Sequence, residues 1–140
     1  MKRITILFLA ILCLIALLCG CAQKGQATED SAAAPSAYTQ ISTAEAVTMM
    51  QTEEDYIILD VRTQVEYNAG HIPDAICIPN ESIGTDEIPQ LPDKKQLILV
   101  YCRSGRRSKE ASQKLADLGY TNIVEFGGII DWTGETVTEE

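Results

Sequence analysis

The residue best suited to take part in a reaction is Cys102. It follows an apolar run at residues 97–101 and begins a loop that leads into a helical pattern. The loop reads Cys-Arg-Ser-Gly-Arg-Arg over residues 102–107. A loop that opens a helix presents backbone N–H groups and the positive end of the helix dipole, and both favour a nearby anion. Such surroundings lower the pKa of a thiol from about 8.5 to roughly 3.5–7.5. The loop therefore predicts a nucleophilic thiolate that reacts with anionic compounds.

The other members of this loop are the candidate substrate-binding residues, Arg103, Ser104, Gly105, Arg106 and Arg107. Arg107, with Arg103 or Arg106, is expected to hold an anionic donor, because a guanidinium group binds oxyanions through two parallel hydrogen bonds. Gly105 allows the loop to bend with its amide groups inward, as anion-binding nests do. A cation at the start of a helix opposes the helix dipole, which favours a functional reason for Arg107.

Short apolar runs and helical patterns alternate along the chain after residue 37. Extended segments are expected at residues 38–41, 56–59, 75–78, 96–101 and 122–126, and helices at 43–51, 64–69 and 107–118. Continuous apolar runs are typical of strands buried on both faces, and their alternation with helices indicates a parallel sheet covered by helices. The predicted fold is α/β, a single small domain with a central, mostly parallel sheet flanked by helices. Ligands of such sheets bind beyond the carboxyl ends of the strands, where Cys102 lies and where Asp60, Pro79 and Gly127 can shape the rim.

Polar and aromatic residues near the predicted site have mainly structural interpretations. Asp60 and Arg62 form a charged pair at a strand end that supports the rim of the site, together with Glu66. His71 is the only histidine, lacks an evident catalytic partner and is expected to hydrogen-bond a turn. Trp132 is expected to pack in the core or at the rim.

Only two of the five cysteines, Cys77 and Cys102, lie in the expected domain. Two cysteines are too few for a disulfide framework, and the absence of a CxxC motif and of a second histidine predicts no metal site and no cofactor. Cys77 stands between two isoleucines, which favours a buried, inert thiol. The alternative is a resolving thiol that forms a disulfide with Cys102.

The first twenty residues have the pattern of a secretory signal. A basic start precedes an apolar stretch at residues 4–18, which is shorter than the ~20 residues that span a bilayer. The Leu-Cys-Gly-Cys run at residues 18–21 resembles a bacterial lipoprotein box, which implies cleavage before Cys21 and lipidation of its sulfur. An uncleaved anchor that ends near Ala22 is the alternative.

The organisation expected from this pattern has four segments. They are a lipoprotein signal peptide at 1–20, a flexible tether at 21–37, the domain at 38–135 and a C-terminal tail at 136–140. The domain is then extracytoplasmic and lipid-anchored to a bacterial membrane through Cys21.

The charge of the chain points to an anionic ligand at one place only. Twenty acidic residues against eleven Lys and Arg give a net charge of −9, which argues against nucleic-acid binding through the general surface. Against this background, Arg103, Arg106, Arg107 and Lys109 lie within seven consecutive residues. A focused anion site is the natural interpretation.

Several local motifs together resemble a rhodanese domain over residues 38–134. The segments that carry the resemblance are Asp60-Val61-Arg62 with Glu66-Tyr67, Gly70-His71-Ile72-Pro73-Asp74-Ala75, Pro79, the Cys102–Arg107 loop, Leu118-Gly119-Tyr120, Gly127-Gly128 and Trp132. The resemblance implies a small α/β fold and sulfurtransferase chemistry through a persulfide on Cys102. It implies a small sulfur-containing anion, thiosulfate or a persulfide, as donor and a thiol or cyanide as acceptor, with a partner protein as a further candidate acceptor.

Two other functions remain open on the same residues. One is a persulfide carrier or partner-binding module, although rhodanese modules of the binding kind commonly lack the cysteine. The other is a cysteine phosphatase or arsenate reductase. Tyrosine phosphatases place five residues between cysteine and arginine, whereas four separate Cys102 from Arg107. The smaller loop suits a single sulfur atom better than a tetrahedral phosphate.

Overall fold

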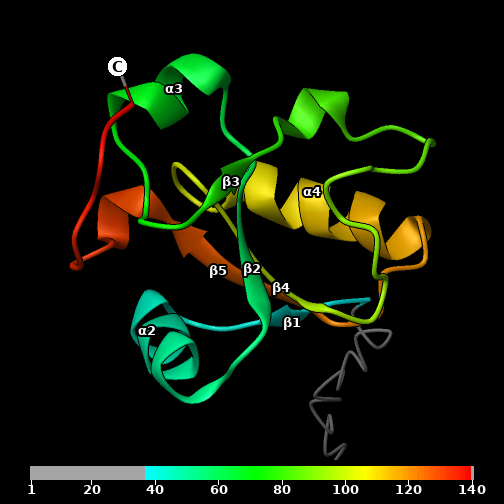
Figure 1. Cartoon of the computed structure of the whole chain (residues 1–140), viewed down its shortest axis with the longest axis horizontal. Helices are drawn as coiled ribbons and strands as arrows, with labels where there is room; N and C mark the ends of the chain where they lie inside the picture. Colours follow the sequence, from blue (N-terminus) through cyan, green and yellow to red (C-terminus); the bar gives the residue numbers. More distant parts are fainter. Residues whose placement is uncertain (1–36, 140) are drawn as a thin grey trace, which may run out of the picture. The chain divides into compact units, whose positions relative to one another are not determined.

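The computed structural model describes residues 37–139, which form a five-stranded sheet with helices on both faces (Figure 1). The strands are β1 (Thr39–Gln40), β2 (Tyr56–Asp60), β3 (Ile76–Cys77), β4 (Leu97–Cys102) and β5 (Ile123–Gly128). The helices are α2 (Thr43–Thr52), α3 (Gln64–Ala69) and α4 (Arg106–Asp117), with short 3₁₀ helices η1 (Asn80–Ser82) and η2 (Ile129–Asp131).

The strand order is β1-β5-β4-β2-β3, and each neighbouring pair runs parallel. The predicted α/β fold with one parallel sheet is confirmed. Because β4 is the middle strand, its carboxyl end is flanked by the ends of β2 and β5 at the same edge of the sheet. This arrangement places Cys102 between two strand ends, where sheets of this kind bind ligands.

Alternate residues of β4 point into two separate apolar layers. Val100 and Cys102 pack with Leu115 of α4 on one face, whereas Tyr101 packs with Tyr67 of α3 on the other face. This division follows from the two-residue period of a strand. Consequently, α4 covers the face of the sheet that Cys102 occupies.

Sequence-encoded caps fix where the helices begin. In α2 the Ser42 side chain caps the Glu45 N–H and the Glu45 carboxylate accepts from the Ser42 N–H at 2.8 Å, and Thr63 and Glu66 repeat this capping box in α3. Such a cap contributes about 1 kcal/mol. The third helix, α4, has no side-chain cap and begins after Gly105 in a left-handed conformation, at φ 94°. The N–H groups of its first turn are therefore free to point at a ligand or at a sulfur atom.

The last strand differs most from the sequence prediction, because β5 continues to Gly128, whereas the expected strand ends at Phe126. A register shift between Val100 and Cys102 maintains the pairing of the two strands, so that Cys102 aligns with Gly128. The end of β5 therefore lies directly beside the Cys102 loop.

The predicted signal peptide, the lipidated Cys21 and nearly all of the tether lie outside the described residues. Within residues 37–139, no helix has the length and apolar character needed to cross a membrane. Residues of the predicted C-terminal tail are hydrogen-bonded: Val137 and His71 exchange two backbone hydrogen bonds of 2.9 Å, and the Glu139 N–H donates to the Asn68 carbonyl at 3.1 Å.

Candidate active site

The Cys102 side chain is enclosed by the loop that follows it. Cys102 is the last residue of β4 and is only 1% exposed. The chain then turns through Gly105, whose left-handed backbone brings its N–H group to 3.1 Å from the Cys102 Sγ. A side chain at Gly105 would be strained at this φ, which explains why glycine stands there.

The electrostatics of the loop favour the ionised sulfur. Burial by itself raises the pKa of the Cys102 thiol, but the Ser108 hydroxyl and the N–H groups of Ser108, Ser104 and Gly105 outweigh it. The pKa of Cys102 therefore lies below its ordinary value, because these donors stabilise the thiolate and not the thiol. The direction is the one that the residue types of the loop predict.

Two polar residues beneath the loop do not belong to the set predicted from the sequence. The buried Ser108 hydroxyl lies 2.5 Å from the Oε1 of Glu125, and the Gly127 N–H donates to the same oxygen at 2.9 Å. The available signals were a serine on the apolar face of α4, one turn before Ala111, and a charged residue inside the apolar run of β5. Each is weak alone, because only the fold brings them together.

Arg107 is held in a bidentate ion pair with Glu66 of α3. Its Nη1 and Nη2 donate to the two carboxylate oxygens at 2.8 Å each. These hydrogen bonds lower the pKa of Glu66 to about 2, and Thr63 contributes through its capping hydrogen bonds. The hydrogen bonds to Glu66 raise the pKa of Arg107, and the charges of Glu66 and Cys102 raise it further, so the guanidinium lies within electrostatic range of the sulfur. Glu66 thus pairs with Arg107, and not with the Asp60–Arg62 pair as the sequence predicts.

The depressed pKa of Glu66 predicts a pH-dependent effect on stability. The ion pair contributes fully above pH 4.5, the ordinary pKa of the carboxyl, and is lost as pH falls towards 2. Glu66→Gln keeps the capping box and should lower the free energy of unfolding by about 1 kcal/mol at neutral pH, with the difference disappearing near pH 2. Urea unfolding at several pH values measures it.

Glu45→Gln is the matched control for this prediction. Glu45 occupies the same position of the α2 capping box, and its lowered pKa comes from hydrogen bonds with Ser42 and not from an arginine. A stability difference for Glu66→Gln that matches the control at every pH would contradict a role for the ion pair.

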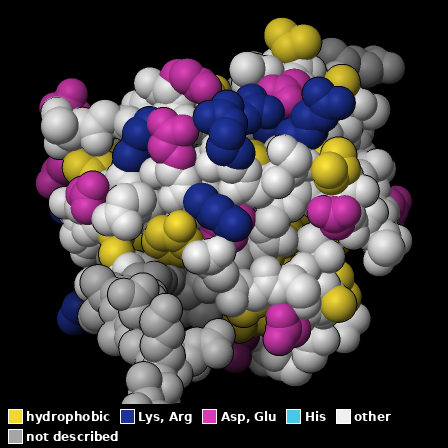
Figure 2. Space-filling model, turned by 180° about the vertical axis from the view of Figure 1, so that it is seen from behind, with side chains coloured by type: hydrophobic (Ala, Val, Ile, Leu, Met, Phe, Trp, Pro, Cys, Tyr) yellow, Lys and Arg dark blue, Asp and Glu magenta, His cyan; other side chains and the backbone are white. Residues whose placement is uncertain are grey.

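The remaining loop residues lie at the mouth of the site. Arg103, Ser104 and Arg106 are exposed, and the Arg106 side chain, 81% exposed, forms a long ion pair with Glu110 at 3.7 Å. Arg103 borders a hollow of about 290 Å³, lined by Arg62, Glu66, Ala69, Gly70, Arg103, Ile129 and Ile130. Figure 2 shows several Lys and Arg side chains side by side across the upper part of the face opposite to that of Figure 1, with acidic side chains beside them.

Asp60 and Arg62 form a buried ion pair under the rim of the site. The Arg62 Nη2 donates to Asp60 at 2.6 Å and to the Gly70 carbonyl at 2.7 Å, and both side chains are at least nine-tenths buried. The guanidinium also lies over the Tyr101 ring, 5.7 Å from its centroid. The pair therefore connects the end of β2 to the turn after α3.

Removal of one partner of this pair should strongly destabilise the fold. Asp60→Ala leaves the buried Arg62 without its counter-ion, and we expect a loss of about 3–5 kcal/mol in the free energy of unfolding. The double variant Asp60→Ala/Arg62→Met removes both charges and should recover part of that loss. Chemical denaturation measures both variants, and wild-type stability of the single variant would contradict this assignment.

The alternative of a resolving thiol at Cys77 is wrong. Cys77 lies on β3, which β2 separates from β4, and it packs on the opposite face of the sheet from Cys102. Two strand spacings amount to about 9.6 Å, which exceeds the Cα separation that a disulfide spans. Burial raises the pKa of Cys77 to about 11, so this thiol is also unreactive near neutral pH.

His71 and Trp132 contact residues that surround the site, and neither is hydrogen-bonded to the Cys102 loop. The Nδ1 of His71 lies 2.9 Å from the Tyr67 carbonyl, and its ring stacks on the Tyr67 ring with centroids 3.7 Å apart. The Trp132 ring packs beside Phe126, and its Nε1–H donates to the Glu135 carbonyl at 3.0 Å.

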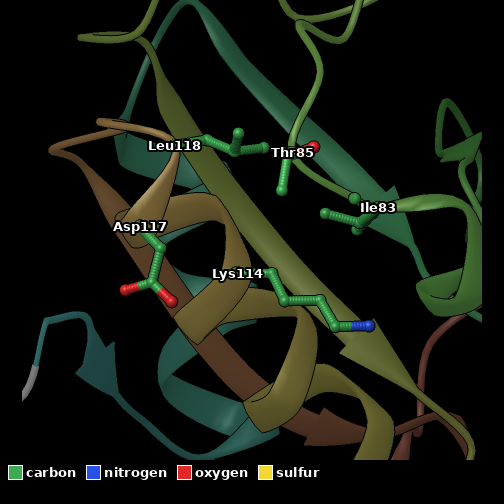
Figure 3. A pocket seen from close by; sticks show the side chains of 6 residues that line it. Ile83, Thr85, Lys114, Asp117 and Leu118 are labelled. Atoms are coloured by element: carbon green, nitrogen blue, oxygen red, sulfur yellow. The ribbon is translucent and has the colours of Figure 1, made fainter.

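A second hollow lies away from Cys102, between α4 and the loop after η1 (Figure 3). It has a volume of about 410 Å³ and is lined by Ile83, Gly84, Thr85, Lys114, Asp117 and Leu118. The Lys114 ammonium points away from Asp117, and it donates to the carbonyl and side-chain oxygens of Asn80 at 2.9 and 3.1 Å. The lysine therefore connects α4 to η1.

Comparison with known proteins shows which family the chain belongs to. The curated proteins that are similar to the chain include two bacterial sulfurtransferases. Thiosulfate sulfurtransferase PspE of Escherichia coli is 36% identical over 73 residues, covering 52% of this chain and 70% of the relative. A sulfurtransferase of Allochromatium vinosum is 40% identical over 82 residues, covering 56% and 73%.

Solved structures and a family model agree with these relatives. A structure described as a rhodanese with anions, from E. coli, is 33% identical with a TM-score of 0.54, covering 59% of this chain and 98% of that one. The rhodanese-like domain of an Anabaena protein is 28% identical with a TM-score of 0.64, covering 71% and 78%. The model of the rhodanese-like domain matches residues 42–135. Because that match spans most of the chain, the chain belongs to the rhodanese-like domain family, which includes sulfurtransferases.

Proposed function

We propose that this protein is a sulfurtransferase that carries sulfane sulfur as a persulfide on Cys102. The observation that supports the proposal is the environment of the Cys102 Sγ, which is buried, lies 3.1 Å from the Gly105 N–H and has a pKa below its ordinary value. A thiolate surrounded by N–H donors is a nucleophile, and the same donors can stabilise the negatively charged outer sulfur of a persulfide.

The reaction consists of two displacements. The Cys102 thiolate attacks the outer sulfur of thiosulfate, a new S–S bond forms, and the old S–S bond breaks as sulfite leaves with its electron pair. A thiolate or cyanide then attacks the outer sulfur of the persulfide, and Cys102 is released as a thiolate. Electrons and atoms balance without a cofactor, because the sulfane sulfur moves between nucleophiles.

Arginine side chains bind the anionic donor in this proposal. Arg107 lies within electrostatic range of the sulfur while Glu66 holds its position, and Arg103 borders the hollow beside the loop. Ser104 and Gly105 stabilise the sulfur through their backbone N–H groups. The Arg106 side chain is 81% exposed and meets the donor as it approaches.

We also propose where in the cell the reaction takes place, and the support for this proposal is the motif at residues 18–21. A lipid on Cys21 anchors the domain outside the cytoplasm at a bacterial membrane. Cys21→Ala in the full chain should prevent incorporation of a labelled fatty acid, which gel fluorescence measures. Label retained by the variant would contradict lipidation at this residue.

The decisive experiment on the reaction is an intact-mass measurement after incubation with thiosulfate. We expect a gain of the mass of one sulfur atom, which peptide mapping assigns to Cys102 and which cyanide removes. A protein that never gains this mass from thiosulfate or from a low-molecular-weight persulfide contradicts the proposal. A protein that gains it and releases it only to another protein is a persulfide carrier.

The phosphatase alternative has its own test. Four residues separate Cys102 from Arg107, so the loop has one residue fewer than the loop of tyrosine phosphatases. The protein is therefore expected to leave aryl phosphates intact. Lengthening the loop by one residue is expected to favour phosphate over sulfur donors.

Arg107→Ala should discriminate between donors of different charge. Loss of the guanidinium weakens the reaction with thiosulfate by about 10-fold or more, and should affect a neutral sulfur donor less, because only the anion loses an ion pair. Single-turnover rates measure both, with Lys95→Ala, which removes an exposed cation outside the loop, as the control. An equal loss with both donors means that Arg107 supports the loop and not the donor.

A further inference from the structure

The exposed apolar side chains of the domain gather around one hollow. Among residues 37–139, three large hydrophobic side chains are exposed, Val65 at 80%, Ile130 at 63% and Val137 at 37%. All three belong to segments that border the hollow beside the Cys102 loop. Exposed apolar side chains that cluster, unlike those that occur singly, mark a surface that binds another molecule.

Each of these side chains is connected to the hollow through its own element. Ile130 of η2 lines the hollow directly. Val65 lies one helical turn before Ala69, which lines the hollow from α3, and residues four apart share a face of a helix. Val137 exchanges two backbone hydrogen bonds with His71, in the turn after α3 that also borders the hollow. Figure 1 shows the red C-terminal segment ending beside α3. We call these three exposed side chains the apolar rim.

One cation beside the sulfur is not neutralised by a neighbouring carboxylate. Arg103 borders the hollow and directly follows Cys102 in the sequence. The other charged residues of the lining, Arg62 and Glu66, are each held in an ion pair. The ion pairs found among residues 37–139 do not include Arg103. The surface therefore offers apolar contacts around the hollow and one available positive charge next to the nucleophile.

The burial of the sulfur and the exposure of the apolar rim favour a protein segment over a small molecule. A small ligand is mostly enclosed by its pocket, whereas Val65 is exposed and stands outside the lining of the hollow. Cys102 is 1% exposed, and a persulfide extends it by one S–S bond of about 2 Å. A flat protein surface cannot reach this sulfur. A cysteine side chain on a protruding, extended segment can reach it while its neighbours lie across the apolar rim.

We propose that the apolar rim docks the sulfur acceptor, which is a protein segment with one cysteine, apolar residues before it and a carboxylate next to it. The apolar residues of this segment contact Val65, Ile130 and Val137. The carboxylate pairs with Arg103, and the cysteine enters beside it at the Cys102 loop. The proposal rests on the sulfur transfer proposed above, because it names the class of acceptor for the second displacement.

The transfer step is balanced in atoms and electrons. The acceptor thiol releases its proton to the solvent, and its thiolate attacks the outer sulfur of the Cys102 persulfide. A new S–S bond forms on the acceptor, and the S–S bond to Cys102 breaks with its electron pair remaining on Cys102. The acceptor leaves as a persulfide, and Cys102 returns to the thiolate.

The test measures docking separately from sulfur transfer. The probe is a fluorescein-labelled heptapeptide with two leucines, a serine in place of the central cysteine and a glutamate directly after it. Fluorescence anisotropy with the full-length protein gives its Kd. We expect saturable binding that weakens about 10-fold or more when both leucines are replaced by glycine. No saturable binding, or equal binding of the glycine peptide, overturns the proposal.

Variants of the apolar rim locate the binding. Val65→Ser and Ile130→Ser change exposed side chains, and each should weaken peptide binding about 5-fold or more while thermal unfolding stays at the wild-type temperature. Thr85→Ser, an exposed position at the hollow of Figure 3, is the matched control and should bind as the wild type does. Wild-type affinity in both rim variants contradicts docking at this surface.

Arg103→Gln tests the charge of the acceptor. It removes the positive charge, so it should weaken binding of the glutamate peptide about 5-fold and leave a matched glutamine peptide unaffected. An equal loss with both peptides contradicts the pairing of a carboxylate with Arg103.

Two further measurements separate the remaining outcomes. Sedimentation velocity tests whether a second copy covers the apolar rim, and a wild-type dimer that Val65→Ser converts to a monomer overturns the proposal. Intact mass follows sulfur from the loaded protein to the cysteine form of the peptide. A protein that binds the peptide but gains no sulfur from any donor contradicts the proposed reaction and not the docking. A protein that loads sulfur, releases it to cyanide and does not bind the peptide contradicts the docking alone.

Discussion

Cys102→Ser is expected to abolish persulfide formation while the fold remains intact. A serine hydroxyl stays protonated in the same ring of N–H donors, and it cannot hold a transferable sulfane sulfur. Loss of a nucleophile of this kind reduces the rate by roughly 10⁴-fold or more. The Gly105 N–H, 3.1 Å from the sulfur, retains an acceptor in the variant, so the free energy of unfolding should change by only about 1 kcal/mol.

Intact mass after thiosulfate treatment measures the chemical effect, and thermal unfolding by circular dichroism measures the structural one. Cys77→Ser is the matched control, because that thiol lies on the other face of the sheet with its pKa raised to about 11. The control should gain one sulfur atom as the wild type does. Sulfur bound by the Cys102→Ser protein would end the assignment of this residue.

Gly128→Ala is expected to displace the Cys102 loop. A Cβ at Gly128 would lie 2.6 Å from both the Arg103 carbonyl carbon and the Ser104 Cα, and closer still to the Arg103 carbonyl oxygen. All three are backbone atoms, so the loop itself must move. A displacement of about 1 Å at a reacting group lowers a rate by about 100-fold, and overpacking of this kind lowers stability by about 1–3 kcal/mol.

Gly84→Ala provides the matched control for this substitution. A Cβ at Gly84 meets nothing within 4 Å, so the variant should keep the wild-type rate and its stability within about 0.5 kcal/mol. Single-turnover kinetics with thiosulfate compare the two variants. A wild-type rate in Gly128→Ala would show that close contact of β5 with the loop is irrelevant to the chemistry.

The local elements of the fold could be predicted because their signals are short-range. The run Tyr56–Leu59 is apolar without interruption, as expected of a strand covered on both faces, and it forms β2. Ser42 and Glu45 form the predicted capping box of α2. The Cys102 loop was readable for the same reason, since its cysteine, glycine and arginines are adjacent in sequence.

The contacts between distant residues could not be predicted in this way. Arg107 and Glu66 are 41 residues apart, and Ser108 and Glu125 are 17 apart. Their pairing depends on which strand ends lie side by side and on the register shift in β4, neither of which a local pattern contains. The same holds for Cys77, because only the strand order separates it from Cys102.

The two outermost strands, β1 and β3, contain two residues each. Unpaired backbone groups at a sheet margin are the template on which a second molecule can add a strand, and a margin this short offers few of them. At high local concentration, copies of this domain should therefore resist edge-to-edge association and fibril growth.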